Sequence, residues 1–386
     1  MLQLKQGTIT FDASRCRQCG VCIAACPQKA LRSSAGYKQY QIICDKSKCI
    51  HCGFCARICE ESLRNGQVND STVQIITARQ ILLAWNRDSN IRYLASSGGI
   101  TRGIIRGVLA HSLYDAVYSL VYFAPGRVAG RWLVQYPEEE HIPCSLYRPI
   151  LWGDAIETIN PAWKKVLLVG LPCQIRAARV FLKYRFPHLI ISSVNIYCKK
   201  QKDFGYSRYI AGFLKQHWKL NTDLVYRGQG WPGHSYIRTD RGNITKKKTF
   251  SYPALCWNLS GCQYCFDSLN ATGADITVAD PWGIVEPHCD EFGQNLVFVW
   301  TEAGERLLSL PSLVRGQAVS LDAAAASISL STLNKKRNDI LPVRMGSREW
   351  FYRLQQWGRR KGGELFLPHI HRWRNYFPKG FSRHSN

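Results

Sequence analysis

The sequence lacks any apolar run that approaches the about 20 residues needed to span a bilayer, which argues against a transmembrane helix. Its first residues, Met1 to Gly7, lack the apolar core of a signal peptide, so export is not expected. Acidic residues are scarce, with 27 Asp and Glu against 51 Lys and Arg, and the net charge is +24. This charge fits nucleic acid, an anionic membrane face, acidic protein partners or a cationic solvated surface, and does not choose among them.

Cysteine, in contrast, is abundant, because 16 of the 386 residues are cysteines. Without export signals, this number favours metal ligation in a reducing cytosol over disulfide bonds. The hydrophobic content of 46% and the charged content of 20% are typical of a folded soluble chain. The length leaves room for a small metal-binding module and one or two globular domains. We therefore expect a cytoplasmic metalloprotein.

Eight cysteines form two runs with the same spacing, C-x2-C-x2-C-x3-C, at residues 16–26 and 49–59. This spacing resembles bacterial ferredoxins with two [4Fe–4S] clusters, in which the fourth cysteine of each run binds the other cluster. The resemblance implies one cluster on Cys16, Cys19, Cys22 and Cys59, and a second on Cys49, Cys52, Cys55 and Cys26. A pair of zinc knuckles is the alternative, but zinc sites do not need this compressed spacing.

Two smaller features accompany the runs. Glycine follows the second cysteine of each run, at Gly20 and Gly53, where the backbone must turn tightly around cluster sulfur. Cys44 lies between the runs and outside both, and we predict that it is a buried small hydrophobe.

After the cysteine runs, the sequence predicts a connector followed by a second domain. Residues 66–90 predict a polar connector that enters a helix containing Ile81–Trp85, and a second domain begins near Ile91. Serines and glycines at 96–99 directly precede an amphipathic helix, whose N-terminal N–H groups can hold a phosphate. An ordinary N-cap explains the same residues equally well.

Alternating strands and helices predict a mostly parallel α/β core with ligands at the carboxyl ends of its strands. Cys173 and Cys198 each follow such a strand. Residues 222–252 predict short β pieces, and the last strand and helix of the core are expected at 295–301 and 302–310. The earlier strands are expected at 116–123, 132–136, 165–170 and 189–197.

This region contains several short motifs: Ala95–Gly99, Ser145–Pro149, Gly170–Gln174, Tyr197–Cys198, Arg227 with Gly230 and Trp231, Cys262–Cys265, and Ala274–Ile276 with Asp280 and Trp282–Gly283. They resemble the motifs of the coenzyme F420 hydrogenase/dehydrogenase beta-subunit family, and their order and spacing agree over about residues 1–310.

The resemblance implies an α+β ferredoxin-like two-cluster module (1–65), followed by an α/β flavin domain with additional β elements (66–340). The basic aromatic tail (341–386) lies outside it. The family implies a flavin, expected to be FAD, that is fed by iron–sulfur clusters. The first motif would line the flavin phosphate or ring, and two further residues would approach from the neighbouring strand end. The implied residues are Ser96, Ser97, Gly98, Gly99 and Thr101, with Pro172 and Gln174.

The remaining cysteines of the family motifs suggest a third [4Fe–4S] cluster, because four thiolates suffice for one. Scattered core cysteines, or a Cys173 beside the flavin, are the alternatives. Cys256 is a possible substitute ligand, and Cys144 and Cys289 are expected to be structural. The four candidate ligands are Cys173, Cys198, Cys262 and Cys265.

These features predict an iron–sulfur flavoprotein oxidoreductase that takes electrons from a low-potential donor, such as ferredoxin or reduced deazaflavin, and reduces an organic substrate. The alternative is an electron-transfer subunit that exchanges electrons with coenzyme F420 or a partner enzyme. Specific nucleic-acid binding is a remote third hypothesis, because no nucleic-acid recognition motif accompanies the charge. The general acid stays open among Tyr147, His234, Asp280 and His288.

The basic tail carries an apolar stripe, Trp350, Phe351, Leu354 and Trp357, among many Lys and Arg. One hypothesis is an interfacial helix that makes a peripheral contact with the anionic inner membrane face. The favoured hypothesis is a helix that packs its aromatic side onto the flavin domain and leaves its charges in water.

Overall fold

A computed structural model describes residues 2–5, 8–64, 75–239, 242–245, 257–265, 269, 273–284 and 290–330. These residues belong to one compact unit, Met1–Tyr252 with Trp257–Asp339. The predicted basic tail lies outside the described residues. Over the described ranges, no helix combines the length and the apolar character that crossing a membrane requires.

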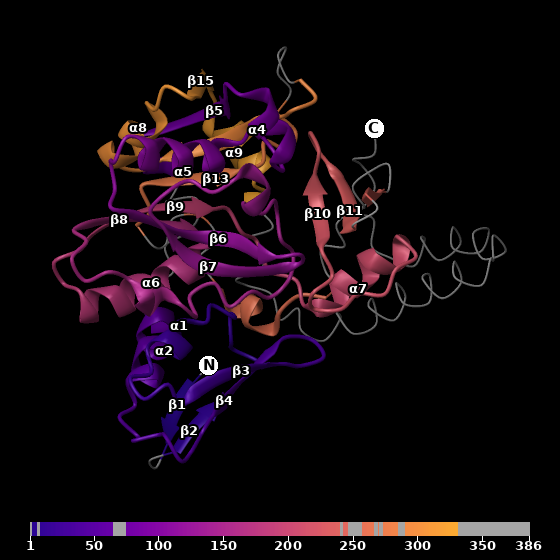
Figure 1. The fold of residues 1–386 in the computed structure, drawn as a ribbon. Coiled ribbons are helices and arrows are strands. Elements are labelled where there is room, and N and C mark those ends of the chain that lie inside the picture. Colours follow the sequence, from indigo (N-terminus) through magenta and orange to yellow (C-terminus); the bar gives the residue numbers. More distant parts are fainter. Residues whose placement is uncertain are drawn as a thin grey trace. The chain divides into compact units, whose positions relative to one another are not determined.

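The N-terminal module, indigo in Figure 1, consists of two antiparallel hairpins and two helices. Each helix starts directly after the glycine of a cysteine run, and both glycines have a positive φ, +82° at Gly20 and +69° at Gly53. The predicted tight turns are thus present, in a backbone region that favours glycine. The elements are β1 (Leu2–Lys5), β2 (Thr8–Phe11), α1 (Val21–Ala24), β3 (Leu31–Ala35), β4 (Tyr40–Cys44) and α2 (Phe54–Arg64).

Eight strands form one sheet in the order β15-β5-β14-β13-β9-β8-β6-β7. The pairs β6–β8, β8–β9 and β9–β13 are parallel, whereas the other four neighbouring pairs are antiparallel. The expectation of a mostly parallel core is therefore wrong, and the sheet is mixed. The strands are β5 (Gln80–Asn86), β6 (Ala116–Ala124), β7 (Arg127–Leu133), β8 (Lys165–Gly170), β9 (Ile190–Ile196), β13 (Ile276–Ala279), β14 (Asn295–Val299) and β15 (Leu313–Ala318).

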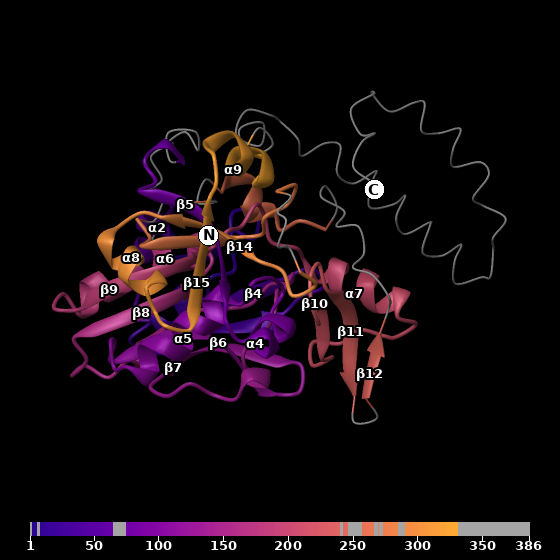
Figure 2. The same ribbon diagram turned by 90° about the horizontal axis from the view of Figure 1, so that it is seen from above.

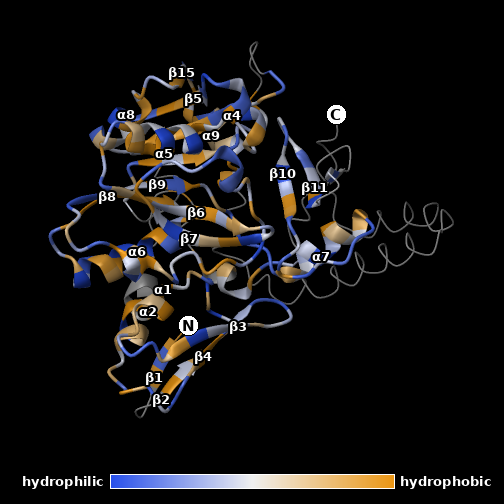
Figure 3. Cartoon of the chain, viewed as in Figure 1, coloured by the Kyte–Doolittle hydropathy of each residue, from blue (hydrophilic) through white to orange (hydrophobic). Residues whose placement is uncertain are grey.

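Helices cover both faces of this sheet because its strands bury alternate side chains on opposite sides. On β8, Leu167 faces α5 (Ile100–Ala110) and α8 (Glu302–Leu308), whereas Leu168 faces α6 (Pro172–Arg185). The short helix α9 (Leu321–Ser327) covers the β5 and β14 end of the α6 face. Figure 3 shows that α5 carries both apolar and hydrophilic residues, as a helix with one buried side must.

The N-terminal module shares its core with the α6 side of the sheet. Val21 of α1 and Ile58 of α2 belong to the same apolar cluster as Phe181 of α6. In Figure 1, α1 and α2 lie directly beside α6. The Gly153 N–H donates to the Cys19 carbonyl at 2.7 Å, which ties the first cysteine run to the loop after β7. The cysteine runs are therefore held against the sheet domain.

A second, three-stranded antiparallel sheet stands to one side of the large sheet together with α7, as Figures 1 and 2 both show. These elements are β10 (Leu224–Gly228), β11 (His234–Thr239), β12 (Gly242–Thr245) and α7 (Phe204–Phe213). They confirm the short β pieces predicted after residue 222. The remaining short elements are α4 (Ser89–Leu94), η1 (Glu139–His141), η2 (Ile156–Thr158) and η3 (Ser260–Tyr264).

Two further expectations differ from the structure. The run Ile81–Trp85, predicted to be helical, lies in strand β5, because it pairs with β14 and β15 on its two sides. The core also continues beyond the helix expected at 302–310, since β15 adds an edge strand and α9 follows it. A short apolar run does not distinguish a buried strand from a buried helix, and strand pairing decides here.

Candidate functional site

The first predicted ligand set lines one cavity of the N-terminal module. Three of its cysteines come from the first run and Cys59 comes from the second. Burial and, to a smaller extent, the nearby Cys59 thiol raise the pKa of Cys19 to about 12. Bound iron would replace these protons, because a coordinating thiol is deprotonated. The set that lines the cavity is Cys16, Cys19, Cys22 and Cys59.

The second predicted set lines a separate cavity, again with one cysteine exchanged between the runs. Burial raises the pKa of Cys55 to about 12, and the neighbouring Cys26 thiol adds to the shift. The Ala30 N–H donates to Cys26 Sγ at 3.2 Å, a contact that also suits a cluster thiolate. The set is Cys26, Cys49, Cys52 and Cys55, and Cys44 shares the cavity with it.

Each cavity is lined by four of the predicted cluster ligands. Among the residues that the structure describes, no three His, Cys, Asp or Glu side chains surround one ion position. A tetrahedral site with metal–sulfur bonds of about 2.3 Å holds its sulfurs about 3.8 Å apart. The four thiolates of a cubane bind four different irons and lie farther apart. Each set supplies the four thiols that one [4Fe–4S] cluster requires, and the cluster assignment stays a prediction.

Three of the four cysteines proposed for a third cluster lie close together. The Cys173 thiol, in the first turn of α6, makes a side-chain hydrogen bond with Cys265, and Cys198 is near enough to raise its pKa. Cys262 lies in η3, and its Sγ accepts a hydrogen bond from the Gln201 N–H at 3.3 Å. Cys173, Cys198 and Cys265 are far apart in the sequence, so the fold brings these three together.

The third set adjoins the first cavity. Cys173 and Ala177 of α6 line the first cavity together with its four cysteines. From the other side, a Cβ on Gly261 in η3 would stand only 2.2 Å from the Cys16 carbonyl oxygen. Such close backbone contact is possible only for glycine. The first and third cysteine sets are therefore adjacent to each other.

The predicted phosphate cradle, residues 96–99, lies after β5 at the carboxyl edge of the sheet. Asn295, at the start of β14, accepts from the Ile100 N–H at 3.3 Å and donates to the Ala279 carbonyl at 3.4 Å. It thereby joins the start of α5 to the end of β13. Gly99 has φ +74° and forms the N-cap of α5. The cradle is thus fixed at the positive end of an 11-residue helix.

Most side-chain oxygens of this cradle already have protein partners. The Ser96 hydroxyl donates to the Arg227 carbonyl at 3.0 Å and accepts from the Ser145 N–H at 2.7 Å. The Ser97 hydroxyl donates to the Gln294 carbonyl. The N–H groups of Gly98, Gly99 and Thr101, in contrast, make no hydrogen bond within the described part of the chain. A flavin phosphate therefore fits these backbone N–H groups better than the serine hydroxyls.

The other two predicted flavin residues lie elsewhere on the same edge. Pro172 and Gln174 start α6 after β8, and β9, β13 and β14 separate β8 from β5. Gln174 is buried, and its Oε1 accepts from the Leu171 N–H at 2.9 Å, which caps the helix. The expectation that they approach from the neighbouring strand end is wrong, because the order of strands differs from the order of the chain.

Arg227 of β10 forms a hub beside the cradle that the sequence did not single out as a site. Its guanidinium donates to Asp280 Oδ2 at 2.5 Å, to the Ser96 carbonyl at 2.8 Å and to the Tyr147 hydroxyl at 3.2 Å. Burial alone would lower the pKa of Arg227, but Asp280 and Tyr147 raise it well above its usual value. The guanidinium therefore stays charged. Arg227, Tyr147 and Asp280 all belong to the family motifs, so these motifs could have indicated the hub.

Two indole rings cover this guanidinium. The Arg227 Cζ lies 5.2 Å from the Trp231 ring centroid and 5.4 Å from that of Trp282. The two rings lie 4.7 Å apart, and Trp282 is 47% exposed. A charged group and a partly open aromatic surface thus meet next to the cradle.

The candidates for a general acid lie in different settings. Tyr147 and Asp280 belong to the Arg227 hub. His234 begins β11, and its buried Nδ1 has no hydrogen-bond partner among the described residues. Cys144 donates to the Leu94 carbonyl at 2.9 Å, which agrees with a structural role. His288, Cys256 and Cys289 lie outside the described residues.

The cysteine cavities and the mixed sheet define an iron–sulfur protein with an α/β domain. Residues 9–32 match the model of the 4Fe-4S binding domain, and residues 163–313 match the model of the coenzyme F420 hydrogenase/dehydrogenase beta subunit, C terminus. These two matches confirm the resemblance to the coenzyme F420 hydrogenase/dehydrogenase beta-subunit family that the sequence motifs indicated.

Among solved structures, a similar chain occurs in the F420-reducing [NiFe] hydrogenase complex from Methanosarcina barkeri, studied as a xenon derivative. It is 17% identical, the match covers 68% of this chain and 90% of that chain, and the TM-score is 0.48. This degree of similarity supports no conclusion about activity. No curated protein matches the chain.

Proposed function

We propose that this chain is an oxidoreductase that holds three [4Fe–4S] clusters and one FAD, and that reduces an organic substrate with electrons from a low-potential donor. Electrons pass from the second cysteine set to the first, then to the third, and reach the flavin at the carboxyl edge of the sheet.

The position of Cys173 carries this proposal. Its side chain lines the cavity of the first set and also contacts Cys265 of the third set. Consecutive redox sites therefore share a residue, and the N-terminal module is fixed to the sheet at that point by the Gly153–Cys19 hydrogen bond. This arrangement supports electron flow from the module into the sheet domain.

The path continues along one edge of the sheet. β9, which ends before Cys198, lies next to β8, and β13, which ends before Asp280, lies next to β9. Neighbouring strands lie about 4.8 Å apart, so the four intervals from β8 to β5 span about 19 Å. The cradle at residues 96–99 thus lies at the far end of a path that begins at Cys173.

FAD, when bound, accepts electrons singly and delivers two, which is what the reduction of a double bond or a carbonyl requires. Backbone N–H groups of Gly98, Gly99 and Thr101 would hold its phosphates at the start of α5. The charged Arg227 and the exposed ring of Trp282 would position a planar or anionic substrate nearby.

A second candidate is an electron-transfer subunit that exchanges electrons with coenzyme F420. The description of the matched family, a coenzyme F420 hydrogenase or dehydrogenase, favours it. The same clusters and the same flavin would serve this function, with the deazaflavin in place of the organic substrate.

Anaerobic reduction followed by reoxidation distinguishes the two functions. The purified chain is first reduced with reduced ferredoxin, and the excess ferredoxin is removed. It is then mixed with coenzyme F420 or with small unsaturated organic compounds. Reoxidation by an organic compound supports the reductase, and reoxidation by F420 alone supports the electron-transfer subunit. A chain that binds zinc instead of iron, or that takes up no flavin after reconstitution, contradicts both.

A further inference from the structure

The cavity of the second cysteine set contains a fifth thiol. Cys44, predicted to be a buried small hydrophobe, is only half-buried and lines this cavity with Cys26, Cys49, Cys52 and Cys55. Its side chain makes a hydrogen bond with the Cys49 thiol. The prediction that Cys44 is buried is therefore wrong, although its side chain does pack against the apolar cluster of the module.

Local structure fixes the two thiols side by side. Cys44 ends β4, and the Cys49 N–H donates to the Asp45 carbonyl at 3.1 Å, which folds residues 45–49 into one turn. The Asp45 carboxylate accepts from the Ser47 N–H at 3.1 Å and from its hydroxyl at 2.6 Å, and so closes the turn. This turn thus places Cys49, a predicted cluster ligand, next to Cys44.

The same strand also anchors the exchanged ligand of this set. The Asp45 N–H donates to the Ala30 carbonyl at 2.8 Å, and the Ala30 N–H donates to Cys26 Sγ at 3.2 Å. Cys44 therefore shares one rigid hydrogen-bonded frame with two of the four predicted ligands. The Cys44 side chain lines the same cavity as these ligands.

The first cavity differs in this respect. Its additional cysteine, Cys173, makes its hydrogen bond with Cys265 and so belongs to the third set. Cys44, in contrast, makes its hydrogen bond with a ligand of its own cavity. Of the two cavities, only the second has a spare thiol that contacts a ligand it could replace, within the part of the chain that the structure describes.

We propose that Cys44 is an alternative ligand of the second cluster and can take the iron that Cys49 holds. The inference rests on the proposed assignment of that cluster. In the exchange, the S–H bond of Cys44 breaks and its sulfur binds iron, while the bond between iron and Cys49 sulfur breaks. The proton passes from Cys44 to Cys49 along their hydrogen bond. No electron is gained or lost, and no further reactant is needed.

Four variants of the full chain, purified or reconstituted without oxygen, test this exchange. The readouts are iron per chain and the electron paramagnetic resonance signal of the reduced second cluster. We expect Cys49→Ala to keep the iron content of the wild type, with an altered signal because one ligand has changed. Cys44 interacts with Cys49 and not with Cys52, so we expect Cys52→Ala to lose about four irons.

The double variant Cys44→Ala/Cys49→Ala should lose the same irons as Cys52→Ala, whereas Cys44→Ala alone should keep them. The signal of the first cluster, retained in all four variants, shows that the module has folded. Loss of about four irons from Cys49→Ala would overturn the exchange while leaving the cluster assignment intact. A wild type that takes up no iron would overturn both.

Discussion

The N-terminal cavities and the carboxyl edge of the sheet place reactive groups in different ways. The eight predicted cluster ligands of the two cavities lie within residues 16–59, and each cysteine run turns tightly at Gly20 or Gly53. The third cysteine set and the Arg227 hub, in contrast, draw on segments between Ser96 and Asp280 that meet only in the folded sheet. Replacing one cysteine of the module should therefore empty one cavity and leave the other intact. The groups at the carboxyl edge of the sheet depend instead on long-range packing.

The largest expected effect is the loss of a whole cluster from one cavity. Cys19→Ala should remove about four irons, because the first cavity loses one of four thiols and has no spare one of its own. The second cavity should keep its iron, since it has separate ligands. Iron and acid-labile sulfide per chain measure this loss.

Cys144→Ala provides the matched control, because Cys144 is half-buried but hydrogen-bonds the Leu94 carbonyl and lies in neither cavity. It should keep all its iron. Equal iron loss in both variants would mean that the loss does not result from removal of a cluster ligand, and would contradict the assignment of Cys19.

The next effect concerns flavin retention at the edge. Gly99→Asp should abolish it by placing a negative charge at the phosphate position, while both N-terminal cavities keep their iron. Gly99→Asn is the control, because Asn has the same size and tolerates the same left-handed backbone. Flavin per chain, measured after reconstitution, should stay near the wild-type value in Gly99→Asn and fall in Gly99→Asp. Equal retention in the two variants would contradict a phosphate site at Gly99.

A smaller effect is expected at Arg17, which links the two regions. Its charge favours the thiolate forms of Cys19 and Cys59 in the first set and of Cys173 in the third. Arg17→Gln should lower the reduction potential of the first cluster by several tens of millivolts, since a nearby charge at an effective dielectric constant of about 20 favours the more negative reduced state.

The exposed Arg15, two residues away, supplies the control for this charge effect. Arg15→Gln should shift the potential much less, and Arg17→Lys should restore it. Potentiometric titration of the cluster signal measures all three variants. Identical potentials in Arg17→Gln and the wild type would show that Arg17 does not act on the cluster.

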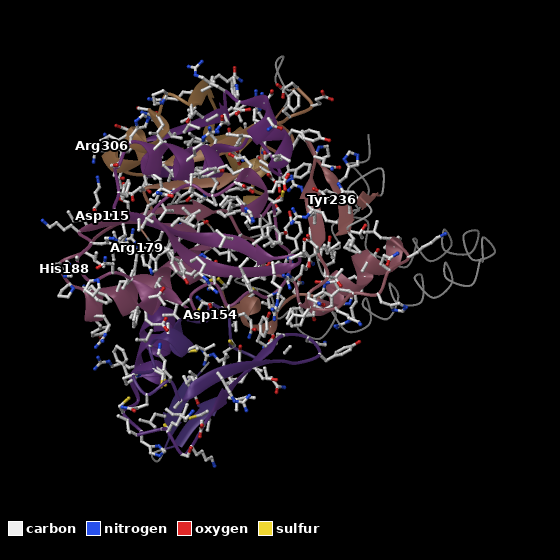
Figure 4. The ribbon with its side chains drawn as sticks, viewed as in Figure 1. Asp115, Asp154, Arg179, His188, Tyr236 and Arg306 are labelled. Carbon is white, nitrogen blue, oxygen red and sulfur yellow. The ribbon has the colours of Figure 1, made fainter. Side chains whose placement is uncertain are left out.

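The smallest effect is a pH dependence at the junction of the two regions, where Figure 4 labels Asp154. Burial raises the pKa of Asp154 to about 6, and its buried Oδ1 has no hydrogen-bond partner among the described residues. Between pH 4 and 6, only the folded state then binds this proton, so the free energy of unfolding falls as pH rises through this window.

Asp154→Asn should therefore stabilise the protein above pH 6, by about 3 kcal/mol at most, and have little effect near pH 4. Thermal unfolding of both proteins at the two pH values measures the difference. A variant that is less stable than the wild type at pH 7.5 would show that the ionised carboxylate has a favourable partner.

The contrast between the regions also explains what the sequence could predict. The resemblance of the cysteine spacing to two-cluster ferredoxins predicted which thiols share each N-terminal cavity, because short turns place them. The position of Pro172 and Gln174 could not be predicted, since it depends on three strands, β9, β13 and β14, that separate β8 from β5. Ile81–Trp85 was assigned to a helix because its partners lie more than 200 residues away. The ligand assignments and the flavin site stay predictions.

The most direct test is the rate at which reduced ferredoxin reduces the bound flavin, measured in the wild type and in Cys19→Ala. If electrons reach the flavin through the clusters, the wild type should reduce its flavin rapidly. Cys19→Ala, which keeps the flavin but lacks the first cluster, should leave it oxidised on the same timescale. Equal rates in the two proteins would show that electrons reach the flavin by another route, and would contradict the proposed path through Cys173.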